Sequence, residues 1–188
     1  MARRAYNAAM AKAKVSQLTY ADLQALPDDE LHRYELIDGE LLVSAAPNTA
    51  HQLAVARLHL LLHAACPPGH QVLFAPYDWL VDDHNVYEPD LLVAPRRAFT
   101  ERFLPQPPLL AVEVLSPSHP GRDLVRKRAA YERAGLTHYW IVDPIAPSVT
   151  VLHLVGGTLV ETGVAKADEP LAVEHPFPVT LVAADLVD

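Results

Sequence analysis

Hydrophobic and polar positions follow strand-like and helix-like periods along the chain, and the N-terminal part shows both. Two short apolar runs, over 33–37 and 40–44, flank Asp38-Gly39. They predict a β-hairpin, because Asp-Gly tolerates the positive φ angles of a tight hairpin turn. The apolar-rich segment Thr49–Ala65 predicts a helix, which the following Pro67-Pro68-Gly69 would end.

After residue 70 the pattern becomes that of short strands. Strands are expected over 71–75, 78–81, 86–93, 109–115, 138–143, 149–154 and 158–162. Pro89 falls within one of them and indicates a strand start, an edge or a bulge, because proline has no N–H to donate. A helix is expected from about 122 to 134, closed by Gly135. Thr19 and Asp22 have the spacing of a capping box, which predicts a short helix near residue 20.

The order of these elements predicts an α/β fold, with a mixed β-sheet flanked by helices and an N-terminal β-hairpin. The 188 residues suit one domain, which we place at 18–188 after an N-terminal extension at 1–17. A hydrophobic share of 51% predicts a well-filled core, and a single cysteine excludes a disulfide framework. No apolar stretch approaches the roughly 18–20 residues that cross a bilayer. We therefore expect a soluble, cytoplasmic protein with no membrane partner.

The formal net charge of −8 is unevenly distributed. Between Arg96 and Arg133 there are eight basic and four acidic residues, so the rest of the chain is strongly acidic. Because phosphate affinity comes from clustered lysine and arginine, the net acidity argues against non-specific coating of nucleic acid. The basic segment still permits a bounded site for a polyanion. On charge alone, the simpler explanation is a solvated helix face with Asp123 and Glu132 as local partners.

Two acidic residues stand in apolar surroundings. Glu113 lies within the strand expected over 109–115, where an ionised carboxylate is costly unless it is paired or bound to a cation. Asp90 follows Pro89 and leads into an apolar run. Each has a structural explanation, which is a buried ion pair or a strand end for Glu113 and a turn for Asp90. On neighbouring strands, the two carboxylates would supply the partial cage that Mg²⁺ completes with waters and phosphate oxygens.

Lys127 lies on the helix that follows the Glu113 strand. A lysine beside a metal site can orient a water molecule and stabilise negative charge on a phosphate. Lys127 also lies four residues after Asp123, so the two share a helix face, and a solvated lysine paired with Asp123 is the alternative. Tyr131 is one further turn along the helix and is expected to pack or to form a hydrogen bond.

An ordered series of motifs joins these residues: YELIDGE, a helix with His51, EPDLLV, EVLSPS, the triplet Asp123, Lys127 and Tyr131, and AGLTHYWIVDP. The series resembles the Uma-two family, which is described as a family of bacterial restriction endonucleases and belongs to the PD-(D/E)XK nuclease superfamily. It spans about Tyr20 to Leu186. The resemblance implies a restriction-endonuclease-like core and a homodimer.

The resemblance also implies a role for the matching residues. Asp90 and Glu113 would be acidic metal ligands, the backbone carbonyl of Val114 a third ligand, and Glu35 an additional acidic residue at the metal. Glu35 faces either the core or the solvent, depending on the register of the hairpin. His51 matches a helical histidine of the family, and the alternative is a surface histidine near a helix N-terminus.

The lysine of the general superfamily signature would fall at Leu115, which is apolar. Residues two apart on a strand share a face, so Leu115 leaves the catalytic face without its cation, and the resemblance implies that Lys127 supplies the ammonium. Supporting positions are expected at His51, Asp123 and Tyr131, and weaker phosphate contacts at Arg122, Arg126 and Arg128.

The leading hypothesis is a Mg²⁺- or Mn²⁺-dependent endonuclease that hydrolyses DNA by in-line attack of an activated water. One alternative is a catalytically silent nuclease-fold module that binds nucleic acid or a protein partner. The net charge favours this alternative slightly, whereas the complete set of two acids and one lysine argues against it. Another alternative is a metal-dependent hydrolase of a different phosphate substrate.

Overall fold

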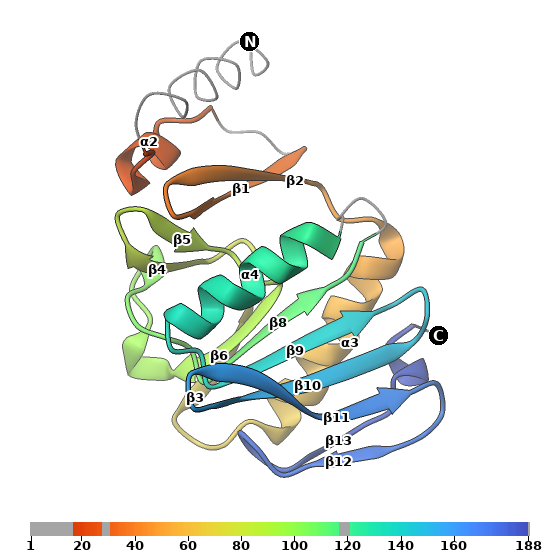
Figure 1. The fold of residues 1–188 in the computed structure, drawn as a ribbon. Helices are drawn as coiled ribbons and strands as arrows, with labels where there is room; N and C mark the ends of the chain where they lie inside the picture. The colour runs from red at the N-terminus through yellow and green to blue at the C-terminus, as the bar shows by residue number, and fades with distance from the viewer. Residues whose placement is uncertain (1–16, 28–30, 117–120, 188) are drawn as a thin grey trace.

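The computed structural model describes residues 17–27, 31–116 and 121–187, with the backbone alone described at 121–123. The expected N-terminal extension at 1–17 therefore lies almost entirely outside the described residues. Within them, the strands form two larger sheets and one two-stranded sheet, and the helices α3 (Thr49–Ala65) and α4 (Gly121–Arg133) pack against the larger sheets (Figure 1).

The first larger sheet has five strands in the order β2-β1-β5-β4-β7. Its strands are β1 (His32–Ile37), β2 (Glu40–Ala45), β4 (Asp78–Asp82), β5 (Asn85–Tyr87) and β7 (Phe103–Leu104). β1 and β2 form the predicted antiparallel hairpin, and the turn residues Asp38 and Gly39 have φ angles of 54° and 73°. The Asp-Gly pair therefore supplies the conformation that the turn requires.

The second larger sheet has six strands in the order β11-β10-β9-β8-β6-β3. Its strands are β3 (His70–Phe74), β6 (Leu91–Pro95), β8 (Leu110–Val114), β9 (His138–Asp143), β10 (Ser148–Val155) and β11 (Thr158–Lys166). β8 and β9 are parallel and are connected through α4 (Gly121–Arg133), while the other neighbours are antiparallel. This is the mixed sheet that the sequence predicts.

Smaller elements complete the described chain. β12 (Leu171–Val173) and β13 (Val179–Leu181) pair with each other, and two short 3₁₀ helices lie at Arg96–Ala98 and Ala184–Leu186. The predicted capping box is present at α2 (Tyr20–Gln24), where Thr19 and Asp22 satisfy each other's backbone N–H groups. In the described part of the chain, no helix is long and apolar enough to cross a membrane.

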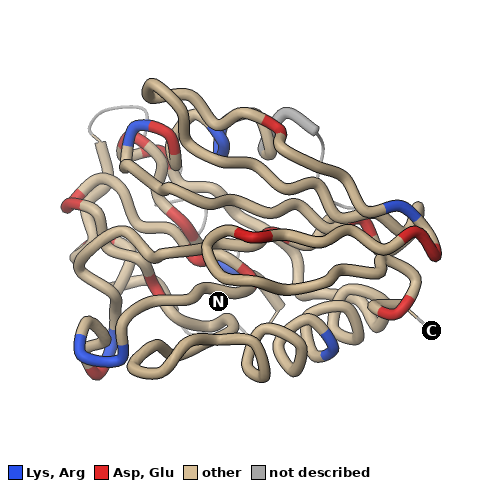
Figure 2. Tube along the Cα trace, turned by 90° about the horizontal axis from the view of Figure 1, so that it is seen from below, with Lys and Arg blue, Asp and Glu red and all other residues tan. Residues whose placement is uncertain are grey.

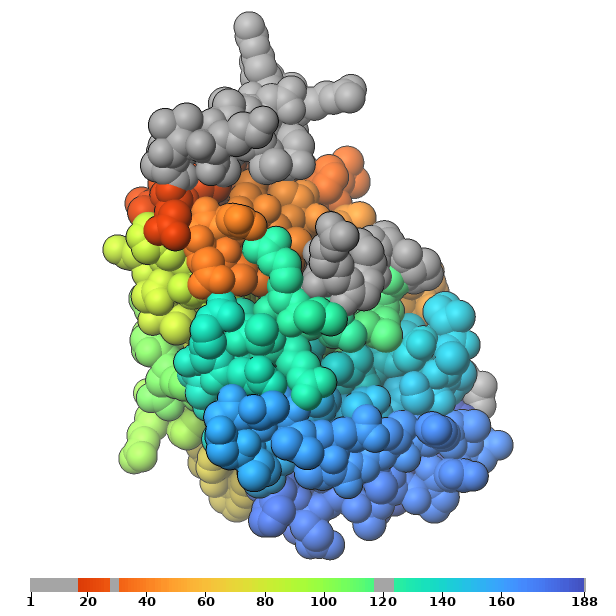
Figure 3. All heavy atoms as spheres, viewed as in Figure 1, coloured from red at the N-terminus to blue at the C-terminus, as the bar shows by residue number. Residues whose placement is uncertain are grey.

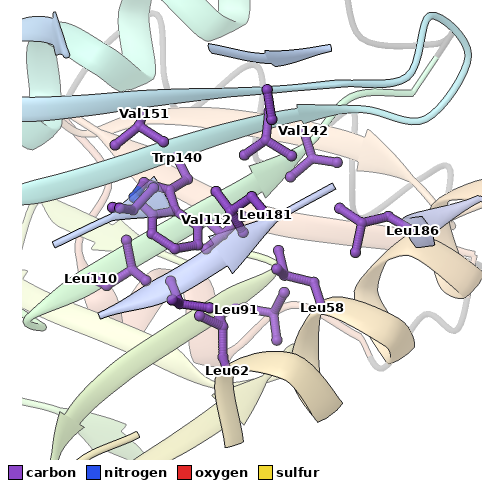
Figure 4. Packing of buried hydrophobic residues seen from close by; sticks show 14 of the residues in the cluster. Leu58, Leu62, Leu91, Leu110, Val112, Trp140, Val142, Val151, Leu181 and Leu186 are labelled. Carbon is purple, nitrogen blue, oxygen red and sulfur yellow. The ribbon is translucent and has the colours of Figure 1, made fainter. Parts of the chain in front are cut away.

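One face of the six-stranded sheet packs against α3 (Thr49–Ala65), the helix predicted for this segment. Alternate residues of a strand point to the same face. Accordingly, Leu110 and Val112 of β8 pack in the same buried cluster as Leu58 and Leu62 of α3 (Figure 4). These aliphatic side chains are fully buried and form the main core of the protein.

The other face of the same strand is turned toward α4. Ala111 of β8 is buried in a cluster with Ala130 and Tyr131 of α4 and Tyr139 of β9. Glu113 lies two residues after Ala111, so its side chain points to the same face. The strand that supplies apolar side chains to one helix therefore presents a carboxylate to the other.

The run expected as a strand over 86–93 is divided between the two larger sheets. β5 ends at Tyr87 and pairs with β1 and β4, whereas β6 begins at Leu91 and pairs with β3 and β8. Pro89 therefore lies in the connection between the two strands, shortly before β6 starts. This agrees with the strand start among the alternatives for Pro89. The local hydrophobic pattern does not reveal such a change of sheet, because both strands are apolar.

The hairpin turn provides a stability test. A Cβ at Gly39 would lie 2.5 Å from the Cβ of Gln17, whereas a Cβ at Gly135 would have no atom within 4 Å, and both residues have positive φ. We expect Gly135→Ala to lower the free energy of unfolding by about 1 kcal/mol through backbone strain, and Gly39→Ala to lower it further. Urea denaturation of both variants measures this difference, and equal losses would contradict the steric contact with Gln17.

Candidate active site

The candidate site lies at the edge of the six-stranded sheet where β6 begins and β8 ends. These strands are antiparallel, and Leu91 pairs with Val112, so Asp90 comes opposite Glu113. The backbone N–H of Val114 donates a hydrogen bond to Asp90 Oδ2 at 2.7 Å. The register of two strands thus brings together the two carboxylates that the sequence singles out.

α4 places an ammonium and a phenol against Glu113. Lys127 and Tyr131 are four residues apart and share the inner face of the helix. Lys127 Nζ donates to both carboxylate oxygens of Glu113 at 3.0 Å, and the Tyr131 hydroxyl donates to Glu113 Oε1 at 2.6 Å. Lys127 is only 4% exposed, so the alternative of a solvated lysine is wrong. The side chain of Asp123 lies outside the described residues.

The β1–β2 hairpin contributes Glu35, a second acid that contacts Lys127. Glu35 is 1% exposed, so its side chain points into the protein and not to the solvent. Its Oε2 lies 2.7 Å from Lys127 Nζ, and its Oε1 accepts a hydrogen bond from the backbone N–H of Glu88 at 2.9 Å. In the space-filling view, α4 lies between this hairpin and β11 (Figure 3). Lys127 therefore joins α4 to both larger sheets.

A second group of contacts surrounds Asp90. Arg33 Nη1 donates to Asp90 Oδ1 at 2.7 Å, and His51 Nε2 lies 3.1 Å from Asp90 Oδ2. His51 is in the first turn of α3, where the side chain of the N-cap residue Asn48 accepts from the His51 backbone N–H. His51 is 5% exposed, so it is a buried neighbour of Asp90 and not a surface histidine.

Three charged residues of this region, Arg33, Asp78 and Glu88, were not predicted as site residues from the sequence. Arg33 Nε lies 2.7 Å from Glu88 Oε1, so Arg33 bridges Glu88 and Asp90. Asp78, at the start of β4, is close enough to Glu35 for the two charges to interact. Sequence spacing offered a signal for two of them, because Arg33 lies two residues before Glu35 and Glu88 lies two residues before Asp90.

Negative charge exceeds positive charge in this cluster. The carboxylates are Glu35, Asp78, Glu88, Asp90 and Glu113. Arg33 and Lys127 are permanent cations that contact all of these except Asp78. Burial raises the pKa of Glu113 to about 7, an increase that Lys127 opposes and Asp90 and Glu35 strengthen. Burial likewise raises the pKa of Glu88 to about 7 and that of Asp78 to about 6. Among the side chains that the structure describes, the cluster is therefore short of positive charge.

Asp90 is the exception among these acids. Burial alone would raise its pKa, but the hydrogen bond with His51 and the charge of Arg33 outweigh burial and hold the pKa of Asp90 well below its usual range. For Lys127, burial alone would lower the pKa, but the negative charges of Glu113 and Glu35 outweigh burial and raise it. Asp90 and Lys127 are thus both charged at neutral pH.

Two hollows share Arg33 in their lining, and Glu35, Glu113 and Lys127 line neither of them. One, of about 510 Å³, is lined by Arg33, His51 and Asp90 together with apolar residues of α3. The other, of about 470 Å³, is lined by Arg33, Asp78 and Glu88. A ligand that entered either hollow would contact Arg33 and at least one carboxylate.

The expected phosphate-binding arginines have other partners. Arg126 forms an exposed ion pair with Glu40 at 2.8 Å, and Arg128 contacts the carbonyl of Leu159 and Glu132. The side chain of Arg122 lies outside the described residues. Lysine and arginine positions are scattered over several places along the described trace, and they form no continuous belt there (Figure 2).

The donor set around Asp90 and Glu113 suits a hard divalent cation. Both side chains offer oxygen, the element that Mg²⁺ and Mn²⁺ prefer. The backbone N–H of Val114 donates to Asp90, which brings the Val114 backbone, whose carbonyl is the expected third ligand, next to this acid. Among the described residues, no three His, Cys, Asp or Glu side chains are arranged around a common ion position. Instead, Arg33, His51 and Lys127 contact the carboxylate oxygens.

Comparisons with known proteins agree with the motifs. The family model Uma2, described as "Putative restriction endonuclease", matches residues 20–185. A crystal structure of a putative nuclease belonging to DUF820, from Anabaena variabilis, matches with a TM-score of 0.73 and 19% identity, over 90% of this chain and 97% of that chain. At this identity the likeness shows the fold alone, and it confirms the expected α/β, nuclease-like fold. A search of curated proteins found no match.

Removing the central ammonium should leave buried negative charge without compensation. We expect Lys127→Met to lower the free energy of unfolding by about 3 kcal/mol at neutral pH without divalent ions. In the double variant Lys127→Met/Glu113→Gln, the loss of unfolding free energy should be smaller than the sum of the two single-variant losses, by more than about 1 kcal/mol. Denaturant unfolding of the three variants measures this coupling.

The exposed pair of Arg126 and Glu40 provides the matched control on the same helix, with side chains that are 39% and 69% exposed. The coupling in the cycle of Arg126→Met and Glu40→Gln should be well below about 1 kcal/mol. Equal coupling in the two cycles would show that burial does not strengthen the contact of Lys127 with Glu113.

The pKa of Asp78, raised from 3.8 to about 6, gives a pH-dependent test. Between about pH 4 and pH 6 the unfolded chain loses a proton that the folded protein keeps, so the native protein loses stability as the pH rises. The stability of Asp78→Asn relative to the native protein should therefore increase across this window and become constant above it. Urea denaturation at fixed ionic strength measures the difference, and a flat or falling difference would contradict the raised pKa.

Proposed function

Because this chain belongs to the Uma2 family, we propose that it hydrolyses phosphodiester bonds of DNA with Mg²⁺ or Mn²⁺ as its cofactor. Family membership confirms the resemblance drawn from the motifs and supports a nuclease-like function. That the substrate is DNA, that the cofactor is Mg²⁺ or Mn²⁺ and that the attack is in line are proposals that go beyond family membership.

The shortage of positive charge in the carboxylate cluster supports the proposal most directly. Asp78, Glu88 and Glu113 have pKa values raised to between about 6 and about 7, so burial without enough cations favours their protonated forms. Burying several carboxylates is costly, and neutral residues of the same size would avoid that cost. A divalent cation would supply the missing positive charge.

Asp90 and Glu113 would hold this cation, with the Val114 backbone beside them and Glu35 as a neighbouring acid. When bound, the cation supplies a Lewis acid for the scissile phosphate and a template for in-line displacement. Lys127 is kept charged by Glu113 and Glu35, so its ammonium can orient an attacking water or stabilise charge on the phosphate. The hydrogen bond from Tyr131 fixes the orientation of Glu113.

Arg33 has a further role in this arrangement. Its guanidinium contacts both Glu88 and Asp90, and it lines both hollows. A cation at Asp90 would compete with this contact, while Glu88 would keep one side of the guanidinium in place. Arg33 would then be free to bind a phosphate oxygen, for which its planar group is well suited.

One observation favours the silent nuclease-fold module as a second candidate. Both oxygens of Asp90 already have protein partners, since Oδ1 accepts from Arg33 and Oδ2 accepts from Val114 and lies near His51. A cluster satisfied in this way can be stable without a metal. The two candidates differ in whether a cation displaces these contacts.

Cleavage and metal binding, measured together, test the proposal. We expect the native protein to cut plasmid or oligonucleotide DNA with Mg²⁺ or Mn²⁺, and Glu113→Gln, Asp90→Asn and Lys127→Met each to lower the rate by about 100-fold or more. Calorimetric titration with Mn²⁺ should show binding that Asp90→Asn weakens. Single-stranded and duplex oligonucleotides of the same sequence identify the preferred DNA form.

Glu40→Gln is the matched control, because it removes a carboxylate from the surface of the same hairpin that carries Glu35. It should cleave like the native protein. Equal cleavage by all the variants would point to a contaminating nuclease and remove the proposed roles. No Mn²⁺ binding and no cleavage by a folded native protein would favour the silent module.

A further inference from the structure

Three imidazoles gather near the start of β9, whereas Glu113 of the carboxylate cluster lies near the end of the parallel neighbour β8. His138 begins β9, His153 is its partner on β10, and His175 lies between β12 and β13. The ring centroids of His138 and His153 are 4.5 Å apart, and His175 lies 6.5 Å and 6.2 Å from them. The three rings and Glu174 line a hollow of about 180 Å³.

His138 is the best-defined member of this group. Its Nδ1 lies 3.0 Å from both the carbonyl oxygen of Leu109 and the hydroxyl oxygen of Thr137. A carbonyl only accepts, so the contact with Leu109 favours the neutral tautomer with the proton on Nδ1 and the lone pair on Nε2. Nε2 is buried and has no hydrogen-bond partner among the described residues, although His138 as a whole is only 8% exposed. An unpaired buried nitrogen is costly, so Nε2 is an atom that a ligand would stabilise.

We propose that His138, His153 and His175 bind one borderline transition-metal ion, of which Zn²⁺ is the representative. Neutral imidazole nitrogens are ligands that Zn²⁺ prefers, whereas Mg²⁺ and Mn²⁺ prefer oxygen. A hydrogen bond from the far nitrogen to a backbone carbonyl, as His138 makes to Leu109, is the usual arrangement behind a metal-binding histidine. The site is chemically distinct from the carboxylate cluster, and it does not depend on the proposed nuclease function.

Ion binding requires two of the rings to turn. The His138 and His153 rings are stacked with their planes 26° apart, and no three such side chains of the described residues surround a common position. His153 is half-buried and His175 is exposed, so both can change rotamer with little disturbance. His138 is held in place and is the fixed ligand. Glu174, or water, would complete a tetrahedral set.

The ion would also connect two parts of the fold. His138 and His153 belong to the six-stranded sheet, whereas His175 lies in the connection of the separate two-stranded sheet. One ion held by all three would fix this connection against β9 and β10. Because it would bind the folded chain and not the unfolded one, it would raise the thermal stability of the protein.

Titration of the metal-free full chain with Zn²⁺ tests the proposal, with excess Mg²⁺ present to occupy the carboxylates. Calorimetry should show one equivalent of Zn²⁺ bound, and Co²⁺ should give the visible absorption of a tetrahedral site. His153→Ala and His175→Ala change only partly or fully exposed side chains, so both should fold, and each should weaken binding at least about tenfold.

His59 and His63 provide the matched control, because they are a second histidine pair, four residues apart on α3, with ring centroids 5.9 Å apart. Zn²⁺ binding should be unchanged in His63→Ala. The proposal is overturned if the native chain binds no Zn²⁺, if His153→Ala and His175→Ala bind it like the native chain, or if binding is lost in His63→Ala instead.

Discussion

The ammonium of Lys127 lies in an interior from which water is largely excluded, and the carboxylates of Glu113 and Glu35 make this position tolerable. Each of these charges would be costly alone, because a buried ion loses its hydration. Together they constrain the fold, since Lys127 comes from α4, Glu113 from the six-stranded sheet and Glu35 from the hairpin. The three elements must meet at one point, and the rest of the site is arranged around it.

β8 shows how the sequence separates packing from chemistry within five residues. Its residues alternate between the two faces, so Leu110, Val112 and Val114 build the apolar core while Glu113 points to α4. A carboxylate at any neighbouring position would instead have entered the aliphatic core beneath α3. The near-continuous apolar appearance of this segment therefore conceals two different environments, which only the helices on each side reveal.

Local patterns predicted the elements well because their causes are local. The Asp-Gly turn, the capping box at Thr19 and the prolines after Ala65 each act within a few residues, and the hairpin and helices follow from them. The sequence singled out Asp90 and Glu113 because a charged group in an apolar context needs a partner, and Lys127 because it lies on the helix after the Glu113 strand and matches the family motif. The contacts of Arg33 with Glu88 and Asp90 span more than 50 residues, and the division of the strands into two sheets depends on equally distant pairing.

The short connection from Glu88 to Asp90 links β5 in one sheet to β6 in the other. Arg33, from the first sheet, forms ion pairs with Glu88 and Asp90, the acids on either side of Pro89. Arg33 therefore ties the first sheet to the start of β6 in the second sheet, and a movement of one sheet relative to the other would also change both ion pairs.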